Sequence, residues 1–241
     1  MVQHGVQMFP VRVPIITQPP AATTAYTNTY SLSFDGTNDY VDLGSEVNAG
    51  TSSTISFWYK HNGDTATRYF TGATSADHFG IRYNGSTILV LIGGYAHADS
   101  HSVSLTVGTW YHFVFARTSD TEIDLYIDGT EVDTLSNAEW SGDDTKIKLI
   151  GSRADGFFTK GNIDEFAIWD EVLDADAVAA VYNSGAPFDL TADKGNYDNS
   201  IDLIAYWRFE EGTGTSAADS AASNTGTLAN GVAFSTDVPT S

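Results

Sequence analysis

The sequence predicts an all-β fold, an antiparallel two-sheet β-sandwich that carries one short helix. Apolar and polar side chains alternate in four segments, which is the period of half-buried strands: residues 30–34, 55–60, 111–116 and 122–127. Turn dipeptides follow or separate such segments: Asn62-Gly63, Asn84-Gly85, Asp128-Gly129 and Asn230-Gly231. At 241 residues, the chain is long enough for one sizeable sandwich.

Individual elements can be assigned in chain order. Asp128-Gly129 predicts a two-residue hairpin, because a type I′ turn needs a positive φ at both central positions. Asp174 can cap a helix whose apolar residues, Val178 and Val181, fall at helical spacing. Gly185 is expected to end that helix, and strand alternation resumes at residues 203–209 after a polar connector.

Composition excludes several classes of protein. The formal charge of −20 comes from 31 acidic and 11 basic residues, so the surface repels phosphate backbones and we expect no nucleic-acid partner. The absence of cysteine excludes a cysteine nucleophile and a zinc–thiolate site. Prolines and Arg12 interrupt the apolar residues near the start, so neither a signal peptide nor a membrane-spanning helix is predicted. We therefore expect a protein made in a cytoplasm that binds no membrane.

Residues 1–28 are expected to form an extended N-terminal arm. Four prolines between Pro10 and Pro20 disfavour helix and favour extended structure. The apolar residues that make docking more plausible than a disordered leader are Phe9, Val11, Val13, Ile15 and Ile16. An arm that docks on a like neighbour predicts a homo-oligomer.

The segment Leu-Ile-Ala-Tyr-Trp-Arg-Phe-Glu-Glu-Gly-Thr-Gly-Thr, at residues 203–215, resembles the one that usually opens a laminin-G-like or pentraxin-like domain. Here it follows three further landmarks of such domains, at residues 34–41, 110–129 and 161–170. The resemblance covers residues 29–236. It implies a concanavalin-A-like jelly roll over residues 29–241, whose usual first strand is supplied by the C-terminal segment 203–236. Both ends of the domain would then lie close together.

The resemblance also carries the functional expectation. Similar domains are common in structural proteins of marine bacteriophages, which implies a virion protein made in the host cytoplasm. We expect a non-enzymatic capsid decoration or cement protein that stabilises subunit joints through its arm and one sandwich face. Its partners would be like subunits and a capsid or other virion protein. The alternative is a carbohydrate-binding adhesin module on a tail, a fibre or a cell surface, with a surface glycan as partner.

A calcium site is a further implication of the resemblance. In similar domains an Asp on a late strand holds Ca²⁺ with groups of the first strand, and Asp164 matches that position. The partner groups map onto Glu211 in the loop at residues 210–212, with Asp35 as another candidate. The alternative is that Asp164 accepts backbone N–H bonds in a tight corner.

Candidate sugar-stacking residues are aromatic side chains near expected loops or strand ends, namely Trp140, Tyr95 and Tyr83. Trp140 is flanked by acidic residues and glycine, which suggests an exposed ring. The alternative for each is ordinary packing at the rim of the sandwich, because scattered exposed aromatics are normal.

Catalysis is not expected. Some glycosidases that share this fold place carboxylates on one strand face, and Glu122, Asp124, Tyr126 and Asp128 alternate in that way. However, Asp128 falls in the predicted turn, and the pattern lacks a Glu at the position that such an enzyme requires. The polar face of an ordinary strand explains these residues better.

Overall fold

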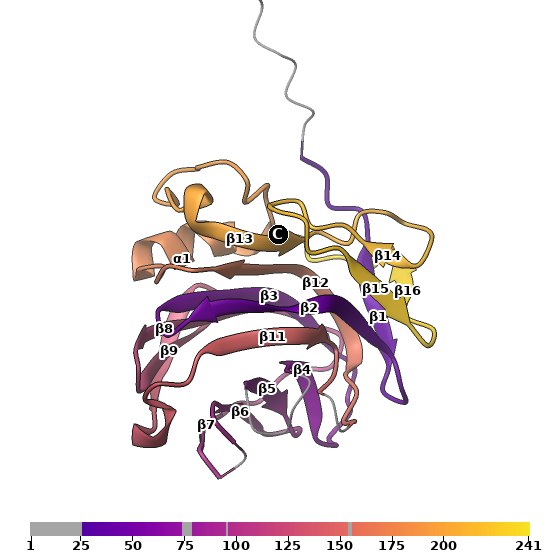
Figure 1. The fold of residues 1–241 in the computed structure, drawn as a ribbon. Helices are drawn as coiled ribbons and strands as arrows, with labels where there is room; N and C mark the ends of the chain where they lie inside the picture. The colour runs from indigo at the N-terminus through magenta and orange to yellow at the C-terminus, as the bar shows by residue number, and fades with distance from the viewer. Residues whose placement is uncertain (1–25, 74–78, 95, 154–155) are drawn as a thin grey trace, which may run out of the picture.

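The computed structural model describes residues 26–73, 79–94, 96–153 and 156–241, and these form a two-sheet antiparallel sandwich (Figure 1). Each sheet has eight strands within the described residues. The predicted all-β sandwich with a short helix is confirmed.

The first sheet has the strand order β10-β9-β8-β3-β12-β1-β16, and β13 also pairs with β12. Its strands are β1 (Ser31–Asp35), β3 (Ser53–His61), β8 (Trp110–Ser119), β9 (Glu122–Ile127), β10 (Thr130–Ser136), β12 (Lys160–Trp169), β13 (Leu203–Trp207) and β16 (Ala233–Ser235).

The second sheet has the order β14-β15-β2-β11-β4-β5-β6-β7. Its strands are β2 (Tyr40–Gly50), β4 (Arg68–Gly72), β5 (Gly80–Tyr83), β6 (Thr87–Leu91), β7 (Ala98–Ser102), β11 (Thr145–Ile150), β14 (Ser216–Ala217) and β15 (Gly226–Ala229).

The C-terminal segment completes both sheets. β13 pairs with β12, β15 pairs with β2, and β16 pairs with β1, with Leu32 opposite Phe234. The last strands of the chain therefore lie beside the first ones, and the described N-terminal residues and the C-terminus meet on the same side of the molecule (Figure 1).

The helix and the hairpin follow the predicted chemistry. The Asp174 side chain accepts a hydrogen bond from the backbone N–H of Ala177, at 2.8 Å, and so caps α1 (Ala175–Tyr182). Asn183, in a left-handed conformation at φ 48°, ends the helix two residues before Gly185. Asp128 and Gly129 have φ values of 50° and 73°, as a type I′ turn requires.

The remaining short helices are single 3₁₀ turns at Ala138–Trp140, Asn183–Gly185 and Ser200–Asp202. None of the helices in the described ranges is long and apolar enough to cross a membrane.

The central strands of the first sheet are buried on both faces, which the alternating pattern did not predict. On the inner face, Phe57 packs against the ring of Phe166 with centroids 5.4 Å apart. On the outer face, Trp58 occupies a position expected to be polar yet is only 4% exposed. The reason is that α1 and the connector at residues 186–202 pack over this face and form a second apolar cluster there.

One buried cation ties the turn between β8 and β9 to the connection between β10 and β11. Arg117 is 1% exposed, and its guanidinium donates to the backbone carbonyl oxygens of Asp120 and Asp143, at 2.8 and 2.7 Å, and of Trp140, at 3.1 Å. The side chain therefore satisfies carbonyl groups that would otherwise be buried without a donor.

Replacing this side chain should destabilise the whole sandwich. We expect Arg117→Met to lower the free energy of unfolding by roughly 3 kcal/mol, because it leaves several buried carbonyl oxygens without donors. Urea unfolding followed by tryptophan fluorescence measures this loss. The control is Lys146→Met, which removes a partly exposed cation. Equal stability of the two variants would contradict the assignment.

Candidate functional site

A backbone bulge in β12 places two consecutive carboxylates on the same face of the first sheet. The pairing of β12 with β3 shifts register between Asp164 and Ala167, and Glu165 has φ 51°. Ile163 and Phe166 both belong to the core between the sheets. Asp164 and Glu165, which lie between them, therefore both point to the outer face.

Residues 26–30, which we call the strap, cross the outer face over this carboxylate pair. The Tyr26 hydroxyl donates to Glu165 Oε1 at 2.7 Å, and Asn28 Nδ2 donates to Asp164 Oδ2 at 3.0 Å. From the sheet itself, the Tyr206 hydroxyl donates to Glu165 Oε2, and the backbone N–H of Glu165 donates to Asp164 Oδ1 at 3.0 Å. Each of the four carboxylate oxygens thus accepts a hydrogen bond.

The strap is also held along its length by residues that follow β13. Arg208 Nη2 donates to the carbonyl oxygen of Thr27 at 2.8 Å, and its guanidinium carbon lies 4.4 Å from the centroid of the Tyr26 ring. Glu210 Oε1 accepts the backbone N–H groups of Thr29 and Tyr30, at 2.8 and 3.0 Å. The strap therefore has a defined position on the sandwich.

Burial determines the protonation of the pair. Asp164 is 0% and Glu165 2% exposed. Burial raises the pKa of Glu165 to about 7, although the hydrogen bonds from Tyr206 and Tyr26 oppose this rise. Burial, followed by the charge of Glu165, raises the pKa of Asp164. Burial therefore favours the protonated form of both carboxyl groups.

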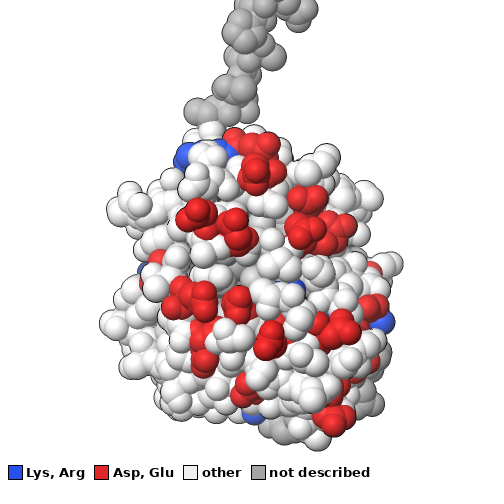
Figure 2. All heavy atoms as spheres, turned by 90° about the vertical axis from the view of Figure 1, so that its left-hand side faces the viewer, with Lys and Arg blue, Asp and Glu red and all other residues white. Residues whose placement is uncertain are grey.

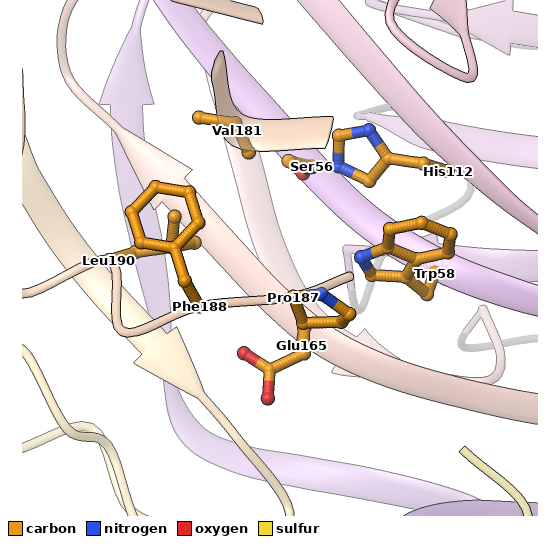
Figure 3. Close-up of a pocket in the computed structure, with 8 residues that line it drawn as sticks. All are labelled: Ser56, Trp58, His112, Glu165, Val181, Pro187, Phe188 and Leu190. Atoms are coloured by element: carbon orange, nitrogen blue, oxygen red, sulfur yellow. Dashed lines mark hydrogen bonds between the residues drawn. The ribbon is translucent and has the colours of Figure 1, made fainter. Parts of the chain in front are cut away.

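A small pocket lies beside Glu165 on the same face (Figure 3). Its empty volume is about 200 Å³, including space that is open to solvent. Its lining residues are Ser56, Trp58, His112, Glu165, Val181, Pro187, Phe188 and Leu190. The strands supply the polar floor, whereas α1 and the connector supply the apolar wall. This volume is below the usual range for a ligand site.

The Ser56–His112 pair in this pocket is not arranged for nucleophilic catalysis. Ser56 Oγ lies 2.7 Å from His112 Nε2. However, burial lowers the pKa of His112 to about 3, so the imidazole is a weak base. His112 Nδ1 is buried and has no hydrogen-bond partner among the described residues, so no third group orients the ring.

The residues predicted to bind calcium do not form a donor set. Asp35 Oδ1 accepts the backbone N–H of Thr37, and Glu211 Oε1 accepts that of Ala218, each at 2.7 Å. The described part of the chain contains no group of three or more His, Cys, Asp or Glu residues that could hold a metal ion. The Asp164 oxygens face N–H donors, including a backbone one as the alternative expected, and this arrangement does not fit Ca²⁺. Calcium binding stays a prediction.

Two of the predicted sugar-stacking residues are buried, so that prediction is wrong for them. Trp140 is 0% exposed, because its 3₁₀ turn directs the ring into the core, where Nε1 donates to the carbonyl oxygen of His97 at 2.5 Å. Tyr83 is 1% exposed and stacks on Phe70 with centroids 6.4 Å apart. Tyr95 lies outside the described residues, as do the arm residues Phe9, Val11, Val13, Ile15 and Ile16.

An aromatic cluster with one exposed ring lies elsewhere, beside the second sheet. Phe157 is 46% exposed and has φ 62°, and its ring lies 6.0 Å from that of Tyr69. The neighbouring ring of Phe158 stacks on Tyr40 with centroids 6.3 Å apart. The sequence signal for this cluster is a pair of consecutive phenylalanines after a glycine, in a segment that is otherwise polar.

Glu165 and its partners Tyr26, Asn28 and Tyr206 were not among the residues predicted from the sequence. The available signal was two adjacent acidic residues inside the apolar run at residues 163–169. In a regular strand, adjacent side chains point to opposite faces, and both faces of this strand are buried. Two adjacent acidic residues there therefore require either a bulge or a buried charge.

A family model described as the Concanavalin A-like lectin/glucanases superfamily matches residues 35–179, which is more than half of the chain. No curated protein sequence matches the chain.

Solved structures show the same fold. A putative carbohydrate binding protein from Bacteroides ovatus superposes with a TM-score of 0.65 at 16% identity, covering 90% of this chain and 62% of that one. The heptameric SAP-like pentraxin from Limulus polyphemus superposes with a TM-score of 0.53 at 19% identity, covering 64% of this chain and 82% of that one. At these identities the likeness concerns the fold alone.

The buried pair predicts a pH dependence of stability. Because the folded state raises the pKa of Glu165 from 4.5 to about 7, it binds more protons than the unfolded state between those values. This contribution, roughly 3 kcal/mol at most, is complete below pH 4.5 and is lost as the pH rises to about 7. Glu165→Gln should flatten that part of the curve in urea unfolding, whereas the exposed control Glu122→Gln should not. Parallel curves for all three proteins would rule the assignment out.

Proposed function

Because the chain belongs to the Concanavalin A-like lectin/glucanases superfamily, we propose that it is a non-enzymatic binding module that joins a protein assembly through its N-terminal segment. In the finer form of this proposal it is a virion protein, a decoration or cement protein bound to like subunits and to a capsid or other virion protein. The observation that carries the proposal is the strap, which anchors the base of that segment to the sandwich.

The strap supports this role because it fixes the place on the sandwich from which the N-terminal segment extends. Its contacts involve a buried carboxylate pair, a guanidinium and a third carboxylate, Glu210. These contacts offset the conformational entropy lost on ordering the strap, so the segment begins from a fixed place on the sandwich. The apolar residues that precede the strap in sequence can then bury area on a neighbour and oppose its separation.

The charge distribution favours attachment through the N-terminal segment over direct contact between the sandwich domains of two copies. One face of the molecule presents many acidic and few basic side chains (Figure 2). With a formal charge of −20, two copies repel each other unless salt screens them. The first eighteen residues contain one Arg and no Asp or Glu, so the segment can approach a like neighbour without that repulsion.

The positions of the carboxylates on β9 and β12 support a non-enzymatic role. On β9, Glu122 is exposed, Asp124 accepts a hydrogen bond from Thr134 at 2.9 Å, and Tyr126 is buried. The acidic pair with raised pKa values, Asp164 and Glu165, lies beneath the strap. A glycosidase needs a raised-pKa acid that reaches the substrate.

The test of attachment keeps the whole chain. We expect the wild-type protein to assemble, and a variant with serine at Phe9, Val11, Val13, Ile15 and Ile16 to be a folded monomer, because only the apolar area is lost. Size-exclusion chromatography with light scattering measures the mass, and circular dichroism checks folding. The control carries Val107→Ser and Ile201→Ser, which replace exposed apolar residues of the sandwich. If the arm variant keeps the wild-type mass, the segment is not the assembly device.

Carbohydrate binding is the second candidate, and the aromatic cluster of Tyr40, Tyr69, Phe157 and Phe158, in which Phe157 is exposed, supports it. An exposed ring can stack on the apolar face of a sugar, and rings held by neighbours lose little entropy on binding. The superfamily includes lectins, and a protein with this fold is described as a putative carbohydrate binding protein.

The glycan proposal predicts a loss of affinity at one side chain. We expect Phe157→Ala to weaken binding of any glycan that the wild type retains on an array by about tenfold, the effect of losing roughly 1.4 kcal/mol of stacking. Ile201→Ala, at an 88% exposed position, should leave the affinity unchanged. If no glycan is retained, or if both variants bind equally, the cluster is not a sugar site.

A further inference from the structure

Two adjacent buried carboxylates require compensation, since burying an unpaired charge is costly. Hard divalent cations are one common solution, because their charge and their preference for oxygen suit clustered carboxylates. Hydrogen-bond donors and a fixed cationic side chain are the other. In this chain Tyr26, Asn28 and Tyr206 supply donors, and the positive charge of Arg208 favours ionisation of Glu165.

We propose that the strap takes the place of a metal ion at Asp164 and Glu165, so that the sandwich is closed by its own N-terminal residues and not by a divalent cation. Half of the hydrogen bonds to the pair come from the strap, one to each carboxylate. Their donors occupy the outer side of the pair, from which an ion would have to approach.

The geometry around Arg208 supports the same assignment. Its guanidinium lies over the Tyr26 ring and binds the Thr27 carbonyl oxygen, so it fixes the strap while its charge favours ionisation of Glu165. A bound divalent ion would place a second positive centre beside this guanidinium. The cationic role at Glu165 is therefore already filled by a side chain, whereas N–H donors face Asp164.

The proposal concerns only how the sandwich is closed, and it holds whether or not the N-terminal segment attaches the protein to a partner. It also predicts that the pair can bind a cation only when the strap donors are removed. Removing its donors should leave one oxygen of each carboxylate without a partner, namely Glu165 Oε1 and Asp164 Oδ2. Those two oxygens, on the same face of one bulge, are then available to a calcium ion.

The experiment measures the melting temperature of full-length proteins in EDTA and in about 5 mM CaCl₂, a concentration that covers weak sites. The wild type should melt at the same temperature in both. The double variant Tyr26→Phe, Asn28→Ala should melt about 5 °C lower in EDTA. Calcium should restore part of that loss, and calorimetric titration should detect binding to this variant alone.

The matched control is Tyr30→Phe, which removes a strap hydroxyl whose ring packs against Phe234 and not against the pair. It should behave as the wild type in both buffers. A wild type that calcium stabilises or EDTA destabilises would overturn the proposal. So would a double variant that melts like the wild type, or one that calcium does not stabilise. If the double variant fails to fold, Tyr26→Phe alone replaces it. The loss of melting temperature in EDTA and its partial recovery in calcium should then both be smaller.

Discussion

The bulge at Glu165 is the constraint on which the outer face of the first sheet depends. By shifting the register of β12 against β3, it turns two carboxylates to the same side and leaves Ile163 and Phe166 in the core. The apolar layer around them would otherwise trap unpaired charges. The positions of the strap, Tyr206 and Arg208 follow from the need to satisfy those charges.

The same face is closed by the opposite end of the chain. Asp237, just after β16, accepts from Lys60 Nζ at 2.5 Å and from Trp110 Nε1 at 3.1 Å, while its carbonyl oxygen accepts from Ser31 Oγ at 2.6 Å. Together with α1 and the connector, the two chain ends cover strands that are apolar on both sides. This arrangement explains how an acidic domain without disulfides buries two apolar clusters, one on each face of the first sheet.

Local chemistry could be predicted from the sequence, whereas the layer above the first sheet could not. The Asp128-Gly129 turn and the Asp174 cap depend on a few neighbouring residues, and both were predicted correctly. The burial of Trp140 and of Tyr83 depends on packing between segments distant in sequence, so flanking polar residues gave the wrong exposure. Of the carboxylate pair, only Asp164 was predicted as a site residue. A bulge interrupts the alternation of apolar and polar residues, so this pattern could not indicate Glu165.

The position of β1 has a mechanical consequence. The strap leads directly into this strand, which is paired on both sides, with β12 and with β16, in antiparallel registers (Figure 1). A pull on the N-terminal segment would act nearly along the strand axis, so both ladders would be loaded in shear. Hydrogen bonds loaded in this way must break together, whereas those at a frayed edge open one after another. Tension at the end where we propose the domain is tethered would therefore be carried by both ladders.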